Sequence, residues 1–405
     1  MSIHLEQVDL FDPELFRDGP PHDVFDRLRR ETPVYWNVRQ DDPDGGFWAL
    51  TRYADVVTVS RDPARFTSSQ GFSAPREPRT NPAFFENIMY RDPPDHTQHR
   101  KPLNRAFTPR AMVDLEGRVR SITLQIIDEV WAMDRFDWVP NVAAQLPARV
   151  VASVIGVPDV DHGKLVEWAS DIFGRDGSPE ASGRFNDAVG SIMGYAEHLK
   201  VTKRSCPADD VMSSLLEAEV NGSPLSETTL SMWFLTLAQA GFETTHTLIA
   251  QGLLVLSDRP ALRDRMTRER DIIPRVVEEM LRFITPVNMM ARTAVEDVEL
   301  NGHLIRAGQY VTMWYSAANR DPDVFDAPHH FDPDRSPNNH QAFGALGSPH
   351  YCLGAHLARL EMRVLLEELA TRGFPFDVDG PAERMPGVFM NALAHLPVVR
   401  RGGGE

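Results

Sequence analysis

The run 226–256 limits the possible folds of this chain more than any other feature. It is typical of one continuous helix of about 31 residues, which is about 46 Å long at 1.5 Å per residue. Ser226 is suited to cap its first turn, and Asp258 to Pro260 mark its end. Apolar side chains cover most of its circumference. Because a helix that is apolar nearly all round must be surrounded by protein, the run predicts the central helix of a large molecule.

The rest of the chain indicates further helices and little β structure. Apolar residues recur at helical spacing in 24–30, 113–131, 146–155, 161–173, 185–200, 274–283 and 353–371. Strand-like patterns are confined to a hairpin of 34–38 with 47–51, to 297–300 with 310–314, and to 389–399. We therefore predict a mainly α protein with a minor β portion, in a single domain over 1–405. The β-rich portion should lie mostly in 30–60, 295–315 and 385–400.

Charge and composition exclude several classes of function. The 405 residues include 58 acidic and 42 basic side chains, a net charge of −16, which argues against duplex DNA or an anionic membrane surface as the main partner. The segment 1–20 lacks the basic and apolar regions of a secretory signal, and polar residues interrupt the run 226–256 too often for a membrane span. Two cysteines cannot form a disulfide framework and fit a reducing compartment. We expect a cytoplasmic protein.

An unusual hexapeptide, Ala240 to Thr245, lies inside the predicted central helix. A glycine costs about 1 kcal/mol against alanine within a helix. The carboxylate of Glu243 is expensive to bury without a partner. The hydroxyls of Thr244 and Thr245 can bond back to helix carbonyls and loosen the helix, which often happens at functional sites. From the residues alone, a distorted helix with satisfied polar groups remains an equal alternative.

Cys352 is the second feature with chemical potential. It follows the loop 343–351, which contains glycine and proline, and precedes an amphipathic helix predicted over 353–371. A cysteine at a helix N-terminus is favoured as the thiolate. A lone cysteine is more often buried and inert. Gly344, Gly347 and Gly354 allow the backbone to approach something bulky, which favours a metal-ligand role for this one.

Two spaced pairs are weak signals by themselves. Glu279 and Arg282 stand three residues apart on a predicted helix, where most such pairs are surface ion pairs. His96 and Arg100 stand four residues apart, and no acidic residue occurs in 96–113. That stretch predicts a local positive patch. It is either a solvated face, a site for a carboxylate-bearing ligand, or a surface for an acidic protein.

These features occur in one order, and in that order the chain resembles the cytochrome P-450 superfamily in its soluble bacterial form, along almost its whole length. The residues that carry the resemblance are Ala240-Gly241-x-Glu243-Thr244-Thr245, Glu279-x-x-Arg282, Phe331-x-Pro333-x-Arg335, and His350-x-Cys352-x-Gly354 with Leu357-Ala358-Arg359-x-Glu361. The resemblance implies the P-450 fold, in which a long central helix lies over haem and the cysteine loop precedes a C-terminal helix.

The resemblance also implies a role for each matching residue. Cys352 would be the axial thiolate ligand of the iron in haem b, iron protoporphyrin IX. Glu243 and Thr244 would deliver protons during oxygen activation, and Gly241 would make room for O2. The haem propionates would be held by His96, Arg100, Arg292 and His350. A structural ion network behind the haem would comprise Glu279, Arg282 and Arg335.

The reaction and the partners follow from the same resemblance. A haem-thiolate monooxygenase inserts one atom of O2 into a C–H bond and releases the other as water. The chain shows no flavin or nicotinamide fingerprint, so a ferredoxin and its reductase would supply electrons to a monomeric enzyme. We expect the ferredoxin to dock on 100–110 together with Arg359 and Arg363. The alternatives are a peroxide-driven peroxygenase, a haem-binding sensor without turnover, and a haem-free hydrolase.

The substrate is expected to be a hydrophobic small molecule. The segment 313–321 looks like that of members acting on steroids, terpenoids and branched lipids, and the irregular, aromatic-rich stretch 67–94 favours a lid over a disordered loop. If family topology holds, the substrate pocket is lined by Phe72, Phe84, Phe85, Met89, Phe173, Ala240, Val287, Met289, Met290, Phe389 and Met390, of which about half are expected to be core instead.

Two departures from the family pattern matter. Phe343 lies nine residues before Cys352, so the cysteine loop is two residues longer than usual and must bulge. The longer loop should change the hydrogen bonds to the Cys352 sulfur, and with them the redox potential, but not the binding of iron by the sulfur. Glu243 stands where the family often has aspartate. Since glutamate is also a carboxylic acid, it can still relay protons. Pro102 should end or kink the helix of His96 and Arg100.

Overall fold

The computed structural model describes residue 5 and the ranges 8–40, 42–73, 85–173, 179–385 and 387–401. The chain divides into two compact units, each assembled from three segments. Unit 1 comprises Met1–Thr97, Leu281–Cys352 and Pro386–Asn391, and unit 2 comprises Gln98–Met280, Leu353–Met385 and Ala392–Glu405. The single domain expected over 1–405 therefore stays a prediction.

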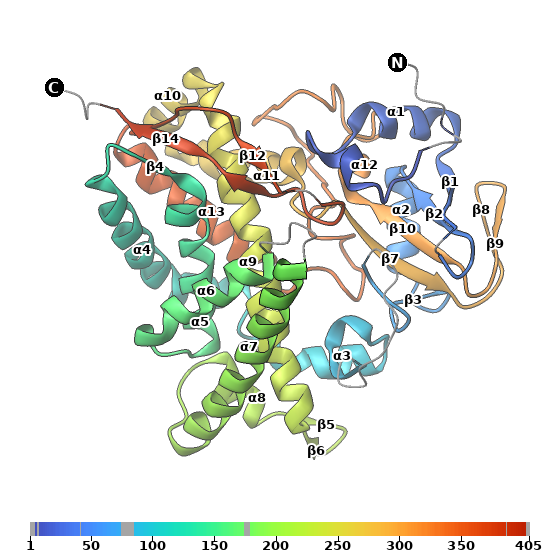
Figure 1. Cartoon of the computed structure of the whole chain (residues 1–405), viewed down its shortest axis with the longest axis horizontal. Coiled ribbons are helices and arrows are strands. Elements are labelled where there is room, and N and C mark those ends of the chain that lie inside the picture. Colours follow the sequence, from blue (N-terminus) through green and yellow to red (C-terminus); the bar gives the residue numbers. More distant parts are fainter. Residues whose placement is uncertain are drawn as a thin grey trace. The chain divides into compact units, whose positions relative to one another are not determined.

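The long helix α9, Glu227–Ser257, belongs to unit 2 (Figure 1). The Ser226 hydroxyl accepts a hydrogen bond from the backbone N–H of Thr229 at 3.0 Å, and Asp258 follows the last turn. Most of the helix is buried. The sequence predicted this helix, its cap and its burial, because an apolar surface on all sides can be shielded only by neighbours on all sides.

Further helices of unit 2 pack along α9, and the sequence predicted most of them with small errors at the ends. Helix α4 begins four residues before its predicted start because the Thr108 hydroxyl accepts from the backbone N–H of Ala111 and caps an earlier turn. Helix α7 extends past both of its predicted ends. The remaining helices of the unit are α5 (Gln145–Ile155), α6 (His162–Phe173), α8 (Val211–Leu216), α10 (Pro260–Arg268) and α13 (Ala355–Thr371), beside α4 (Pro109–Trp131) and α7 (Pro179–Ser205).

Unit 1 is built around a five-stranded sheet in the order β1-β2-β10-β7-β3. The predicted hairpin is confirmed, with β1 (Val34–Val38) antiparallel to β2 (Gly46–Leu50). The sheet continues through β10 (Tyr310–Trp314), β7 (Met289–Ala294) and β3 (Phe66–Thr67). The helices and helical turns of the unit are η2 (Pro13–Phe16), α1 (His22–Glu31), α2 (Tyr53–Arg61), η4 (Ile88–Tyr90) and α12 (Tyr315–Ala318). Helix α3 (Asp95–Arg100) and helix α11 (Ile273–Ile284) each run from one unit into the other.

The strands predicted at 297–300 and 310–314 both form, but they do not pair with each other. The segment predicted at 297–300 does not belong with β10: it forms β8 (Val298–Leu300), which pairs with β9 (His303–Ile305) in a separate two-stranded sheet. The turn at Asn301 and Gly302, both at positive φ, folds β8 directly back on β9. The place beside β10 is taken by β7, whose buried pattern on both faces gave no alternation to detect.

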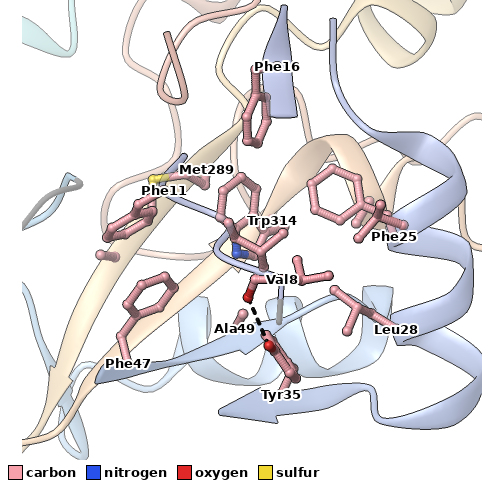
Figure 2. Close-up of a cluster of buried hydrophobic side chains, with 14 of the residues drawn as sticks. Val8, Phe11, Phe16, Phe25, Leu28, Tyr35, Phe47, Ala49, Met289 and Trp314 are labelled. Atoms are coloured by element: carbon pink, nitrogen blue, oxygen red, sulfur yellow. Dashed lines mark hydrogen bonds between the residues drawn. The ribbon is translucent and has the colours of Figure 1, made fainter. Parts of the chain in front are cut away.

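Core clusters of unit 1 lie on both faces of the five-stranded sheet, and one of them is drawn in Figure 2. Figure 2 shows Phe11, Phe16 and Phe25 around Trp314, with the Phe11 ring stacked on Phe47 at 3.9 Å between centroids. The Tyr35 hydroxyl donates to the backbone oxygen of Val8 at 2.9 Å, so the polar end of this buried ring is satisfied. The cluster fastens the N-terminal segment to the sheet that carries β7.

The C-terminal part of the chain adds small sheets to unit 2. A three-stranded sheet has the order β11-β14-β4 and consists of β11 (Phe376–Val378), β14 (Pro397–Arg400) and β4 (Arg135–Asp137). Two-stranded sheets are formed by β12 (Glu383–Arg384) with β13 (Leu393–His395), and by β5 (Glu219–Val220) with β6 (Ser223–Pro224). Among the described residues, no helix has the length and apolar character needed to cross a bilayer.

Candidate active site

The loop that carries Cys352 is closed by its own backbone. The N–H of Cys352 donates to the oxygen of Phe343 at 3.0 Å, and the N–H of Ser348 donates to the oxygen of Ala345 at 3.0 Å. Gly344 and Gly347 have φ of 78° and 86°, which side chains rarely tolerate. The helix α13 begins at Ala355, two residues later than predicted. The half-buried thiol of Cys352 therefore belongs to the loop before the helix and not to its first turn.

The cysteine loop projects outward at Leu346. Leu346 is 68% exposed, and its backbone oxygen accepts from Nε and Nη2 of Arg61 at 2.8 Å and 2.5 Å. Arg61 is the last residue of α2, so the projecting part of the loop is held by a neighbouring element of unit 1. The loop thus projects at Leu346 while the backbone hydrogen bond from Cys352 to Phe343 closes it, and the bulge expected from the longer spacing stays a prediction.

Three of the four residues expected to hold propionates lie in unit 1. His96 on α3 is buried, and its ring lies 4.1 Å from the ring of His350 between centroids. The Nε2 atom of His350 lies 3.0 Å from Ser68 Oγ. Arg292 on β7 is buried, and its Nη1 donates to the oxygen of Ala291 at 2.6 Å. Arg100 ends α3 and belongs to unit 2, followed by the 3₁₀ turn η5 (Lys101–Leu103), in which Pro102 ends the helix as predicted.

The surroundings of the Arg292 guanidinium indicate whether the site suits a cofactor that carries negative charge. No carboxylate of the described residues lies within ion-pair distance of it, and burial lowers its pKa. A buried cation without a counter-ion is costly unless an anion completes the site. A porphyrin that carries carboxylates and an iron atom fits this donor set, since Arg292, His96 and His350 suit the carboxylates and the Cys352 thiolate suits the iron.

The acid and alcohol of the central helix lie in unit 2. The Thr244 hydroxyl donates to the Ala240 oxygen at 2.9 Å, which is the back-bonding expected of a threonine within a helix. Glu243 is half-buried. A Cβ on Gly241 would lie 2.6 Å from Cγ2 of Val151 on α5, so the glycine lets α5 and α9 approach closely. This packing is a reason for the glycine that the sequence did not reveal.

Two of the three residues expected in a structural network are deeply buried, and Arg335 is partly buried. Glu279 and Arg282 on α11 are fully buried. Arg282 donates to the backbone oxygens of Asn319 at 2.9 Å, Pro328 at 2.8 Å and His330 at 3.0 Å. Arg335 also reaches the His330 oxygen, at 3.4 Å, and donates to Asp326 O at 2.8 Å. Arg282 therefore organises the irregular segment that leads to the cysteine loop.

Several residues predicted to line a pocket gather around β7 in unit 1. The Phe72 oxygen accepts from Ala291 N at 2.7 Å, and the Phe389 oxygen accepts from Asn288 N at 2.9 Å. Val287 forms a β-bridge with Met390.

Lying at or near β7 does not make each of these residues a pocket residue, and other residues of the set lie elsewhere. Met289 is fully buried in the core of Figure 2, and Val287 and Met290 pack against a second core cluster, whereas Phe85 is 43% exposed. Met289 is therefore core, as sequence reasoning expected for about half of the set. Met89 lies in the turn η4, and Ala240 is exposed on α9. Phe84 and the side chain of Phe173 fall outside the described residues.

Sequence reasoning missed four polar residues near these elements. Ser68 and Asp92 bond to each other beside His350. His246 on α9 is buried, and neither of its ring nitrogens has a hydrogen-bond partner among the described residues. Burial raises the pKa of Glu361 on α13 well above its usual value. For His246, the signal was available: it lies four residues after Phe242, on a helix predicted to be buried all round.

The basic residues expected to dock a ferredoxin differ in their surroundings. Lys101, Arg105 and Arg110 are exposed, and none forms an ion pair with a described residue. Arg359 instead binds both oxygens of Glu278, at 2.6 Å and 2.8 Å.

Arg363 is engaged in the same way. It binds Glu116 at 2.6 Å and Glu367 at 2.7 Å, so it ties α13 to α4 and to its own next turn. The two arginines beyond the cysteine therefore stabilise unit 2, and their part in a docking face for a ferredoxin stays a prediction.

Comparisons with known proteins agree with this arrangement. The family model described as Cytochrome P450 matches residues 183–381. The chain is 38% identical to the putative cytochrome P450 126 of Mycobacterium tuberculosis over 98% of this chain and 99% of that one. It is 34% identical to the steroid C26-monooxygenase of Rhodococcus jostii over 97% and 84% of the two chains.

A solved structure matches the fold over the same extent. The structure of Mycobacterium marinum cytochrome P450 CYP268A2 in complex with pseudoionone superimposes with a TM-score of 0.90 at 33% identity, over 98% of this chain and 100% of that one. Identity of this level over nearly the full length, together with a thiol loop, a buried arginine that no described carboxylate pairs with, and an acid–alcohol pair in a long buried helix, shows that the chain belongs to the cytochrome P450 family of haem-thiolate monooxygenases.

Proposed function

We propose that this P450 hydroxylates a hydrophobic small molecule of the steroid, terpenoid or branched-lipid class, with O2 and with electrons from a ferredoxin. The observation that carries the assignment of the site is Arg292, a buried guanidinium that no described carboxylate neutralises. Haem bound there supplies oxygen activation, in which one oxygen atom enters a C–H bond and the other leaves as water. A cytoplasmic monomer is part of the same proposal.

Each residue of the site then has a defined task. The Cys352 thiolate holds the iron, and Arg292, His96, His350 and Arg100 hold the haem carboxylates. Glu243 takes protons from solvent, and the Thr244 hydroxyl holds the water that receives them. The Thr244 hydroxyl proton already points to the Ala240 oxygen, so its lone pairs are left to accept from that water.

The substrate class is supported by the apolar surroundings of β7 and by the relatives. Phe72, Tyr90 and Phe389 lie in one unit beside β7, and the rings of Phe72 and Tyr90 meet edge to face at 5.0 Å. One relative is named as acting on steroids and one structural neighbour holds pseudoionone. Binding of cholest-4-en-3-one, linalool and a methyl-branched fatty acid, followed by the change in iron spin state, should single out one class.

The thiolate assignment is tested by replacing Cys352. The wild-type protein should contain haem and give the red-shifted carbon monoxide band of thiolate ligation. Cys352→His should retain haem, because the carboxylate-binding residues are untouched, but should lose that band and all turnover. The proposal is wrong if the wild type is colourless, or if Cys352→His keeps the carbon monoxide spectrum of the wild type.

The electron donor is tested on the exposed basic stretch. Arg105→Glu and Arg110→Glu should each raise the KM for ferredoxin about tenfold at low salt, and the difference should shrink at high salt, because docking charges act through screened fields. Arg268→Glu on α10 makes the same change of charge at another exposed position and should leave the KM unchanged. Equal effects of all three variants would refute this docking surface.

A further inference from the structure

Ser68 and Asp92 form a fully bonded pair beside the propionate-holding residues of unit 1. Asp92 Oδ1 accepts from Ser68 Oγ at 2.8 Å and from Ser68 N at 2.9 Å. Asp92 Oδ2 accepts from the hydroxyl of Thr67. Ser68 is completely buried, and its Oγ lies 3.0 Å from Nε2 of His350. Both carboxylate oxygens are thus engaged before any cofactor is considered.

The directions of these hydrogen bonds follow from the number of protons. The Ser68 hydroxyl has one proton, and the carboxylate of Asp92 is the strongest acceptor within reach, so the proton points to Asp92. A lone pair of the same oxygen then accepts the Nε2–H of His350. The imidazole is held by this bond at one edge and by the ring of His96, 4.1 Å away between centroids, at its side.

Asp92 is also the carboxylate whose negative charge acts on Arg292. Burial lowers the pKa of Arg292, and the negative charge of Asp92 opposes that effect. A carboxylate in this position would compete with a cofactor carboxylate for the arginine if its oxygens were free. Because Ser68 and Thr67 occupy both oxygens, Asp92 supports the cationic site without occupying it.

We propose that Ser68 and Asp92 are positioning residues that fix the imidazole of His350 for a haem carboxylate. The proposal rests on the role of His350 given under the proposed function. It explains why a fully buried serine and an acid stand among residues that otherwise attract anions. It also links the strand β3 and the start of α3 to the cysteine loop, since Ser68 follows β3 and Asp92 precedes α3.

The test measures haem release from the purified holoenzyme to excess apomyoglobin. Ser68→Ala removes the bond to His350 Nε2, and we expect release about fivefold faster, as for the loss of one net hydrogen bond. Asp92→Asn keeps an acceptor oxygen for Ser68 but loses the charge, and we expect release about twofold faster. Ser69→Ala alters the same turn, where Ser69 Oγ lies 2.7 Å from the Thr67 hydroxyl, and should leave release unchanged.

A combination of variants separates positioning from general destabilisation. If Ser68 acts through His350, the double variant Ser68→Ala/His350→Gln should release haem no faster than His350→Gln alone. Additive effects, or wild-type release from Ser68→Ala, would overturn the inference. If His350→Gln itself releases haem at the wild-type rate, the role of His350 fails and the inference fails with it, while the carbon monoxide spectrum still tests the thiolate. Thermal midpoints of the single variants should match that of the Ser69→Ala protein.

Discussion

Two buried polar residues of this P450, Arg292 and His246, differ in what their surroundings indicate. Arg292 has an environment that calls for an anion, since it is buried and no described carboxylate pairs with it. The surroundings of His246 are apolar. Its ring packs on Phe242, with 5.9 Å between ring centroids, and its two ring nitrogens have no hydrogen-bond partner among the described residues. The first side chain points to a ligand, whereas the second is a cost to stability.

The cost of His246 should depend on pH. Burial lowers its pKa to about 4, from about 6.5 in the unfolded chain. Between these values the unfolded state binds the proton and the folded state does not, so the free energy of unfolding falls as the pH drops from 6.5 to 4. The loss amounts to at most about 3 kcal/mol. His246→Leu should remove this part of the acid dependence, as measured by urea unfolding at pH 7, 6 and 5.

A control is available on another helix. His356 on α13 is exposed, and His356→Leu reports the general effect of losing an imidazole. If both variants keep the pH dependence of the wild type, the buried imidazole does not contribute to it. A variant of His246 that is less stable than wild type at pH 5 would contradict the explanation directly.

Between elements, one close contact of the central helix is the approach of α5 to Gly241. The two helices pack closely along their lengths, and Val151 lies where a side chain at position 241 would be. Helix α13 is joined to α4 by a different kind of contact. Arg120 and Arg363 bind Glu116, which lowers the pKa of that carboxyl to about 2. Close packing and ion pairing thus fasten two sides of the same unit.

Gly241→Ala should destabilise the protein by about 1 to 3 kcal/mol, because the new methyl group would overlap Val151. The double variant Gly241→Ala/Val151→Ala should recover part of that loss. Gly194→Ala on α7, where nothing lies within 4 Å, should instead stabilise by about 0.5 to 1 kcal/mol through helix propensity. Urea unfolding of the three variants checks the order, and a Gly241→Ala protein as stable as Gly194→Ala would show that the helices can separate at no cost.

For the whole molecule, the prediction of a single domain depends on how the chain passes between the two units. Each unit is assembled from three separate segments, and the chain passes between the units at five places. A unit made of distant segments cannot complete its core before all of them are in place. We therefore expect one cooperative unfolding transition of the holoprotein.

The measurement is a urea titration followed by far-UV circular dichroism and by tryptophan fluorescence, since both units contain tryptophans such as Trp314 and Trp138. The two curves should coincide. Two separated transitions would mean that the units fold as independent domains. Addition of more haem than the protein binds serves as the control, because it should leave the midpoints in place.

The sequence by itself determined the features that depend on local pattern. The helix α9 followed from a continuous apolar surface, the hairpin of β1 and β2 from alternation and a turn, and the family from motifs in order. Such features depend on residues close together in the chain, so their signals survive without knowledge of the fold. Even there the ends of α4 and α13 shifted, since caps and loop closure decide them.

The tertiary structure alone decided which distant residues meet. It paired β10 with β7 instead of β8, bound Arg359 to Glu278, and placed Ser68 and Asp92 beside His350. These contacts join positions up to 282 residues apart, and many partners of equal chemistry compete for them in the sequence. Only the packing of whole elements excludes those competitors, because a hydrogen bond or an ion pair forms within about 3 Å or not at all.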